Sequence, residues 1–190
     1  MRNALIDSIR GLLKLERHRA ALVVIDGPAG AGKTTLAEEI RKSVGEGEVI
    51  HCDDLYNGWD DALTPTLERH LLEWIVGPLS QGQLPIYQKY DWSTGRYGKQ
   101  IHVPHTRLVI LEGVGAALKC VTDIADISIW LEIPQSLGPA FGLTRVLERD
   151  GAQIETEMLR WIEQQKEFFK EHHNRDNCSI HLPYGAPAEQ

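Results

Sequence analysis

One short stretch, residues 27–34, constrains this chain more than any other. It reads Gly-Pro-Ala-Gly-Ala-Gly-Lys-Thr and matches the pattern G-x-x-x-x-G-K-[ST] in full. It follows an apolar run rich in β-branched residues at 21–26 and precedes the helix-forming residues 34–42. In such a turn between a buried strand and a helix N-terminus, backbone N–H groups and the helix dipole together bind phosphate. The sequence therefore predicts a nucleotide-binding phosphate loop.

The residues of this loop have expected roles toward ATP. Lys33 would supply a positive charge to the β and γ phosphates, the Thr34 hydroxyl would bind Mg²⁺, and Thr35 would reach the α phosphate. The remaining nucleotide-binding residues are those of the loop itself: Gly27, Pro28, Ala29, Gly30, Ala31 and Gly32. The alternative, a glycine-rich turn that only joins strand to helix, fits the complete match poorly.

Segments typical of strands and helices alternate along the chain. Apolar runs lie at residues 48–51, 107–112, 127–133 and 178–182, and helical spacing of apolar residues is found at 65–79, 136–150 and 155–173. Continuous apolar strands that alternate with helices predict an α/β domain with a five-stranded, mostly parallel sheet covered by helices on both faces. Together with the phosphate loop, this alternation of strands and helices predicts the three-layer P-loop NTPase fold.

Three segments are additions to this alternation. Residues 84–104 carry aromatic side chains on two short extended arms joined through Ser-Thr-Gly, which predicts a hairpin flap on the acceptor side. Residues 136–160 are expected to form a helical lid, and residues 1–19 an amphipathic N-terminal helix packed on the surface. With 190 residues, of which 42% are hydrophobic, the chain is expected to form one domain over residues 1–190.

Charge and cysteine content exclude several classes of partner. The formal net charge of −7 argues against binding to a nucleic-acid polymer or an anionic membrane, because such proteins neutralise phosphates with a basic face. The interleaved charges of the N-terminal segment are unlike a signal peptide or membrane span. Three scattered cysteines predict neither a zinc site nor a disulfide framework and indicate a reducing cytoplasm. A homo-oligomer is compatible with all of these features.

The chain lacks the motifs that define other classes of nucleotide-binding protein. A GTPase needs N-K-x-D and D-x-x-G, and neither pattern occurs. Residues 79–83, Leu-Ser-Gln-Gly-Gln, approach the L-S-G-G-Q signature of ABC-type ATPases. However, Leu84 and Pro85 lead directly into the expected hairpin, where that class opens a helix. A turn after a helix is the better interpretation.

Two carboxylates follow expected strands and are candidates for the chemistry. Asp53 comes directly after the strand at 48–51, at the edge of the sheet where the phosphate loop also lies. It is the candidate general base for an alcohol that attacks the γ phosphate, and a candidate Mg²⁺ ligand, although it could instead cap a turn. Glu112 ends an apolar strand and is expected to hold Mg²⁺, although a solvated strand end is the alternative.

Two arginines four residues apart lie on one face of an expected helix. Arg145 and Arg149 could close over ATP and neutralise the transition state as lid residues, since the planar guanidinium matches phosphoryl oxygens. Ion pairs with Glu148 and Asp150 on a solvated helix are the alternative. Arg160 is a weaker third candidate.

The acceptor side is expected to combine aromatic rings with polar groups. Aromatic faces can stack on a ring, and carboxylates can accept hydrogen bonds from vicinal hydroxyls. The candidate residues are Tyr56, Asp60, Asp61, Tyr87, Tyr90, Trp92 and Arg96. About half of the aromatic residues are expected to pack in the small core under the flap instead.

The order of these motifs resembles the uridine kinase and phosphoribulokinase branch of P-loop kinases over roughly residues 21–160. The resemblance is carried by residues 26–35, by Asp53-Asp54-Leu55-Tyr56, by Pro85-Ile86-Tyr87, by Leu111-Glu112-Gly113 and by residues 145–150. It implies ATP and Mg²⁺ as cofactors and a small-molecule phosphate acceptor. It also implies Asp53 as catalytic aspartate, Glu112 as magnesium-linked acid, Tyr87 as a base-contacting residue, and Arg145 with Arg149 as lid arginines.

The chain departs from the family at the acceptor side. Leu55 stands where an aromatic residue is usual, and Tyr90-Asp91-Trp92 stands where uridine kinases carry a Thr-His pair. The leading hypothesis is a nucleoside or sugar-like alcohol kinase. The alternatives are a nucleoside monophosphate kinase, whose acceptor phosphate could bind Lys89, Arg96 and Lys99, and an ATP-binding regulatory protein without phosphotransfer.

Overall fold

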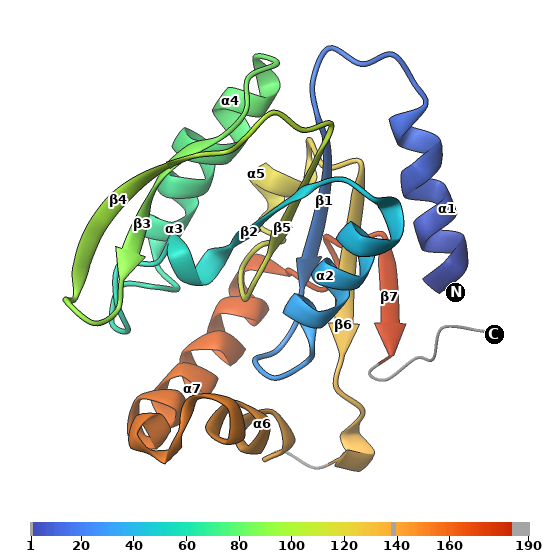
Figure 1. The fold of residues 1–190 in the computed structure, drawn as a ribbon. Coiled ribbons are helices and arrows are strands. Elements are labelled where there is room, and N and C mark those ends of the chain that lie inside the picture. The colour runs from blue at the N-terminus through green and yellow to red at the C-terminus, as the bar shows by residue number, and fades with distance from the viewer. Residues whose placement is uncertain (1, 138–139, 184–190) are drawn as a thin grey trace.

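A five-stranded parallel sheet forms the centre of the molecule (Figure 1). The computed structural model describes residues 2–137 and 140–183. The strands lie in the order β2-β5-β1-β6-β7, and every neighbouring pair is parallel. Their bounds are Ala21–Asp26 for β1, Glu48–His51 for β2, Leu108–Glu112 for β5, Ile127–Glu132 for β6 and Ile180–Pro183 for β7. The strands and fold class predicted from the sequence are confirmed.

Helices cover both faces of this sheet. They are α1 Arg2–Leu13, α2 Lys33–Val44, α3 Pro65–His70, α4 Gly77–Ser80, α5 Lys119–Thr122, α6 Phe141–Asp150 and α7 Glu155–His172. Alternate residues of β1 face opposite sides, so that Val23 packs with α1 and α2 while Val24 packs with α3, α5 and α7. The result is the expected three-layer arrangement.

Two helices differ in extent from the sequence-based expectation. The N-terminal helix, expected over residues 1–19, ends at Leu13, because the chain then turns back to β1 and Arg17 and Arg19 both pair with the Asp126 carboxylate. The helix expected over 65–79 widens to a π-helical segment at Leu71–Val76 before α4. Pro78, which has no N–H to donate, lies just after this widening. Part of the expected lid, residues 138–139, lies outside the described residues.

The predicted flap is a separate two-stranded antiparallel sheet beside the main one (Figure 1). Strand β3 spans Ile86–Asp91 and β4 spans Arg96–His102. The turn forms because the Asp91 carboxylate accepts hydrogen bonds from the N–H and hydroxyl of Ser93, and because Gly95 adopts a φ of 67°. The hairpin meets the main domain next to η1, a single 3₁₀ turn at Cys52–Asp54.

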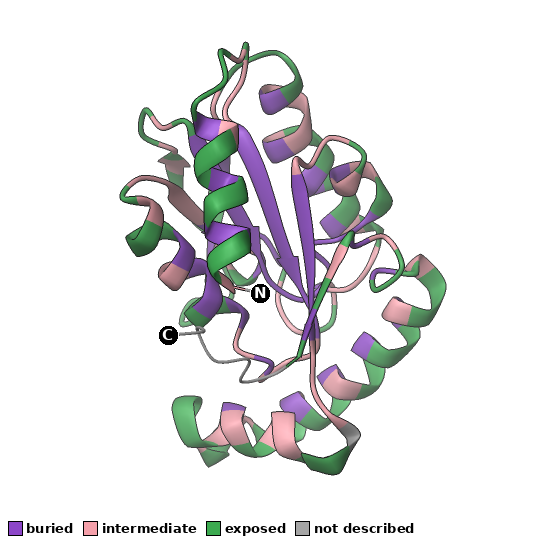
Figure 2. Cartoon of the chain, turned by 90° about the vertical axis from the view of Figure 1, so that its right-hand side faces the viewer, coloured by how far each residue is buried: buried purple, intermediate pink, exposed green. Residues whose placement is uncertain are grey.

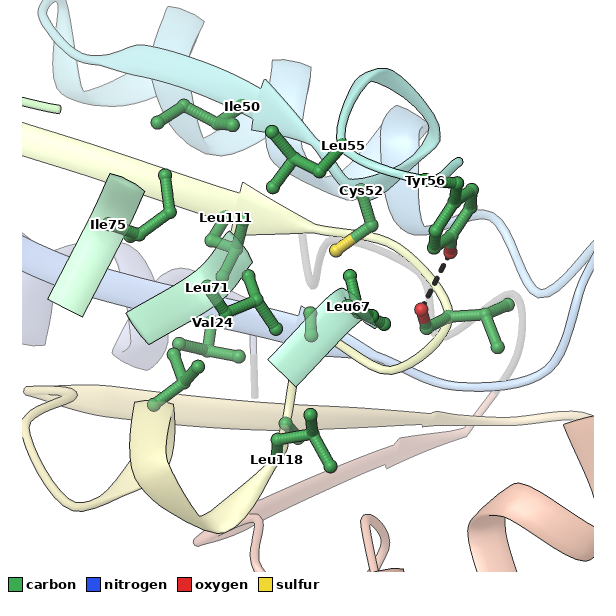
Figure 3. Close-up of a cluster of buried hydrophobic side chains, with 14 of the residues drawn as sticks. Val24, Ile50, Cys52, Leu55, Tyr56, Leu67, Leu71, Ile75, Leu111 and Leu118 are labelled. Atoms are coloured by element: carbon green, nitrogen blue, oxygen red, sulfur yellow. Dashed lines mark hydrogen bonds between the residues drawn. The ribbon is translucent and has the colours of Figure 1, made fainter. Parts of the chain in front are cut away.

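Burial is concentrated in the central sheet (Figure 2), whereas α6 and α7 present exposed faces. Beneath the hairpin, the core joins Cys52, Leu55 and Tyr56 to Leu67 of α3 (Figure 3), where the Tyr56 hydroxyl donates a hydrogen bond to the carbonyl of Val114. Within the described ranges, no helix combines the length and apolar character that crossing a bilayer requires.

Candidate functional site

A cavity of about 1020 Å³ lies at the carboxyl ends of β1, β2 and β5. This is the edge of a parallel sheet at which α/β proteins bind ligands. The phosphate loop, η1, the hairpin, the loop after β5 and helices α6 and α7 all contribute to its walls. The fold therefore brings most of the predicted catalytic residues to one cavity.

The phosphate loop has the backbone shape that only glycine allows. Gly27 adopts a φ of 144°, and a Cβ there would lie 2.5 Å from the carbonyl oxygen of Leu131. Gly30 adopts a φ of 76°, and its Cβ would lie 2.6 Å from the carbonyl oxygen of Gly142 in α6. Helix α2 begins at Lys33 without a side-chain cap. Its first N–H groups and its positive dipole end are therefore suited to an anion such as phosphate.

Lys33 is nearly buried at the base of this loop, with 8% of its surface exposed. Its ammonium group donates hydrogen bonds to the carbonyl oxygens of Gly27 at 2.8 Å and Pro28 at 2.9 Å. Burial lowers the pKa of Lys33, and the charges of Glu112, Asp26 and Asp53 oppose that change. A positive charge on the wall of the cavity is where an ATP phosphate would need it.

Glu112 ends β5 and connects the phosphate loop to β2. The Thr34 hydroxyl donates a hydrogen bond to the Glu112 carboxylate at 2.9 Å, and the His51 ring contacts the same oxygen. Strand register explains this contact, since His51 pairs with Glu112 across β2 and β5. The hydrogen bond with Glu112 raises the pKa of His51. Sequence reasoning missed His51, although its position at the end of β2 was a signal.

Thr34 and Glu112 have the donor chemistry that Mg²⁺ prefers. No cluster of three or more His, Cys, Asp or Glu side chains among residues 2–137 and 140–183 could hold a metal by itself. The residues therefore fit an ion that shares its coordination with nucleotide phosphates and water, as Mg²⁺ does in phosphotransferases.

Asp53 lies in η1 and lines the same cavity as the phosphate loop. The pKa of Asp53 is raised, first because the protein atoms around it disfavour the charged form, although the residue is exposed, and second because Glu112 is negatively charged. Lys33 and Arg149 oppose this shift. Within the described part of the chain, no hydrogen-bond donor contacts the carboxylate, which leaves it open toward the cavity.

The two predicted lid arginines differ in their contacts. Arg145 donates a hydrogen bond at 2.6 Å to the carbonyl of Gly30 in the phosphate loop. Arg149 also lines the cavity, but it pairs with Asp150 through two hydrogen bonds of 2.7 and 2.6 Å, as the alternative interpretation expected. Arg160 is exposed on α7 and is not among the residues that line the cavity.

The predicted acceptor residues separate into two groups. Tyr56 and Trp92 line the cavity, although the Tyr56 hydroxyl already donates to Val114. The residues that do not line it are Asp60, Asp61, Tyr87, Tyr90 and Arg96.

These five residues have other positions for physical reasons. Asp61 accepts hydrogen bonds from Asn57 and from Thr64, the residue that caps α3. Adjacent residues of a strand point to opposite faces, so Tyr87 packs in the core while its neighbours on β3 face solvent. Burial raises the pKa of Tyr87 to about 12. Tyr90 packs against the rings of Trp92 and Tyr97. Asp60 and Arg96 are exposed.

Two tryptophans that sequence reasoning missed complete the acceptor wall. Trp59 lies with its ring centre 5.1 Å from Trp92 and 5.8 Å from Trp161 of α7, both edge to face. Trp161 also packs against Tyr56 at 5.1 Å. All four rings line the cavity. Only the fold brings residues 56–59, 92 and 161 together, so no short sequence motif predicts that these rings share one cavity.

Two buried polar residues support the phosphate loop from behind. The Asp26 carboxylate accepts hydrogen bonds from the backbone N–H groups of Gly27, Gly115 and Ala117 and from the Asn174 side chain. The Gln165 side chain on α7 accepts one from the N–H of Ala29 at 2.9 Å. These bonds connect the loop to the segment after β5 and to α7.

Comparisons with known proteins agree with this geometry. Residues 1–121 match the AAA ATPase domain family. The uridine kinase of Halobacterium salinarum is 28% identical over 184 residues, covering 85% of this chain and 79% of that protein.

Solved structures show the same fold. A possible uridine kinase from Bacillus stearothermophilus superposes with a TM-score of 0.62 at 16% identity and covers 93% of this chain and 96% of that one. A candidate fructose transport system kinase from a Silicibacter species superposes with a TM-score of 0.62 at 18% identity and covers 96% and 99%. Helices α6 and α7, which lie beyond the family match, are thus included in the structural similarity.

Proposed function

Because this chain belongs to the AAA ATPase domain family of P-loop proteins and is a P-loop kinase of the uridine kinase-like type, we propose that it transfers the γ-phosphate of Mg·ATP to a hydroxyl group of a small, nucleoside-like acceptor. The proposed acceptor is a small molecule of the cell rather than a polymer. The three cysteines are free thiols, which supports a place for it in the reducing cytoplasm.

One observation carries the proposal: a single cavity is lined by Lys33 of the phosphate loop, by Asp53, and by an aromatic wall whose Trp92 contacts the backbone of Asp53. A protein that only bound ATP would have no need for an open carboxylate in the same cavity as its phosphate loop and an aromatic wall. Phosphotransfer needs such a group, because the attacking alcohol loses its proton during transfer.

Each residue has a role that follows from its contacts. The phosphate loop and Lys33 bind and orient the phosphates of ATP, and Arg145 and Arg149 add positive charge from α6. Thr34 and Glu112 would hold Mg²⁺, which when bound neutralises charge on the phosphates. Asp53 accepts the proton of the acceptor hydroxyl, and its raised pKa brings it closer to the working pH of a general base.

The contacts favour an acceptor without its own phosphate. Of the three cations considered for binding an acceptor phosphate, Arg96 and Lys99 are exposed on β4 and do not line the cavity. Lys89 does line it, but its ammonium group pairs with the Asp54 carboxylate at 2.9 Å. The aromatic wall of Trp59, Trp92 and Trp161 instead suits a flat ring.

The test is ADP release from Mg·ATP with a panel of nucleosides, their 5′-monophosphates and phosphorylatable sugars. We expect at least one nucleoside-like alcohol to stimulate ADP release, and its 5′-phosphate to reduce or abolish that stimulation. Stimulation by monophosphates alone would replace the proposal with a nucleoside monophosphate kinase. Tight ATP binding without stimulation by any acceptor would favour a regulatory ATP-binding protein.

A further inference from the structure

The hairpin contacts each residue from 53 to 56, a stretch that begins in the turn that carries the proposed catalytic base. The indole N–H of Trp92 donates a hydrogen bond to the backbone carbonyl of Asp53 at 3.0 Å. Lys89 pairs with the Asp54 carboxylate at 2.9 Å. The hydroxyl of Tyr97 lies 3.0 Å from the carbonyl oxygens of both Leu55 and Tyr56. The two strands of the hairpin and the turn between them thus contact four consecutive residues of the main domain.

Trp92 differs from Tyr97 because it also belongs to the cavity. Its ring lines the acceptor wall and packs edge to face against Trp59 at 5.1 Å and Tyr90 at 5.0 Å. Although 41% of its surface is exposed, these contacts and the bond to Asp53 fix the indole at both ends. One side chain therefore touches both the space for the acceptor and the backbone of the base.

The hydrogen bond from Trp92 reaches the turn that carries Asp53, and a small displacement of this turn would move the proposed base. η1 is a single turn directly after β2, and only Cys52 among its three residues is buried. The backbone bonds of the turn from Leu55 and Tyr56 end on the carbonyl of Cys52, so the bond from Trp92 adds a contact to the carbonyl of Asp53. Because proton transfer requires the base within hydrogen-bond reach of the hydroxyl, a displaced turn lowers the rate of the chemical step.

We propose that Trp92 is a positioning residue, which holds Asp53 in the orientation that accepts the acceptor's proton through its N–H bond to the Asp53 carbonyl. This inference rests on the proposed kinase activity. It makes the hairpin part of the catalytic arrangement as well as a cover for the acceptor.

The test compares Trp92→Phe, which keeps an aromatic ring but removes the N–H donor, with Trp74→Phe as a matched control outside the cavity. Loss of one hydrogen bond that acts on the chemical step is expected to lower kcat about 3- to 10-fold. The KM values for acceptor and ATP should stay within about twofold, because the ring remains. Trp74→Phe should leave kcat and both KM values unchanged.

A double variant separates positioning from a general structural effect. In the Asp53→Asn background, adding Trp92→Phe should change kcat by less than about twofold, since the group that Trp92 positions is already lost. An equal loss of kcat in both backgrounds, or a rise in the KM of the acceptor alone, would overturn the inference. Wild-type turnover in the same assay tests the proposed function separately.

A second measurement tests the hydrogen bond without any activity. The Nε1–H resonance of Trp92 can be assigned by its disappearance from the NMR spectrum of Trp92→Phe. We expect its exchange with solvent to be at least about tenfold slower than that of free tryptophan, because a bonded N–H exchanges only when the bond opens. Exchange as fast as in free tryptophan would contradict the proposal whatever the turnover.

Discussion

The donor and acceptor sides of the cavity are built in different ways. The donor side is built around one continuous segment, residues 27–35, whose shape depends on glycine backbone and on the start of α2, and Glu112 and Arg145 contact this segment. The acceptor side is assembled from η1, the hairpin and α7, and its wall consists of large side chains. Phosphate binding is thus encoded locally, whereas acceptor recognition depends on how distant segments pack. Changes on the two sides should therefore affect different kinetic constants.

The largest effect is expected on the donor side, from Lys33→Ala. The substitution removes the buried ammonium group beside the phosphate loop, and a lost transition-state charge contact costs about 10²- to 10³-fold in turnover. Lys42→Ala, on the exposed part of the same helix, is the control and should leave turnover unchanged. ADP release with the best acceptor measures both. Wild-type activity in Lys33→Ala would remove the phosphate loop from the reaction.

Glu112→Gln should change the dependence on Mg²⁺. The variant keeps the shape of the side chain but removes the charge that accepts the Thr34 hydroxyl, which should weaken apparent Mg²⁺ affinity about 10- to 100-fold. Titration of ADP release with MgCl₂ measures this, and Glu132→Gln at the end of β6 is the control. An unchanged Mg²⁺ titration would show that Glu112 only supports His51 and Thr34.

Trp59→Ala should act on the acceptor alone. Removing the central ring of the aromatic wall takes away a stacking surface, which is expected to raise the KM of the acceptor about tenfold. The KM of ATP should remain the same, because the rings that Trp59 packs against are those of Trp92 and Trp161 on the acceptor side. Steady-state kinetics with each substrate varied in turn separate the two constants. An equal rise in both would contradict the division into two sides.

The smallest effect is expected from Asp61→Asn, which tests the corrected position of this residue. Asp61 orders the turn before α3 through Asn57 and Thr64, so the free energy of unfolding should fall by about 1 kcal/mol. Urea denaturation measures that change, and kcat and the acceptor KM should stay at the wild-type values. A large rise in the acceptor KM would return Asp61 to the acceptor site.

The difference between the two sides also explains how far the sequence could be interpreted. The phosphate loop, the five parallel strands, the hairpin and the cavity positions of Asp53, Glu112 and Arg145 were all predicted, because local patterns determine strand ends and helix starts. Strand ends of a parallel sheet meet at one edge, so carboxylates placed there converge without any knowledge of packing.

The aromatic wall could not be predicted in the same way. Tyr87 and Tyr90 carry the aromatic character expected of an acceptor site, but the register shift between Gln88 and Tyr90 lets both rings, three residues apart on β3, enter packing contacts. Trp161 lies more than 100 residues from Asp53, in a helix whose direction is set by tertiary contacts such as the bond between Gln165 and Ala29. Contacts between residues that lie so far apart in the sequence leave no signal in short motifs.

The central claim is that Asp53 takes part in phosphoryl transfer between the two sides. The most direct measurement is the transfer of labelled γ-phosphate from ATP to the acceptor, compared between the wild type and Asp53→Asn, with ATP affinity measured by calorimetry. We predict that labelled acceptor forms about 10²- to 10⁴-fold more slowly in the variant, while the Kd of ATP changes by less than about twofold. Equal rates of labelling in the two proteins would contradict the account.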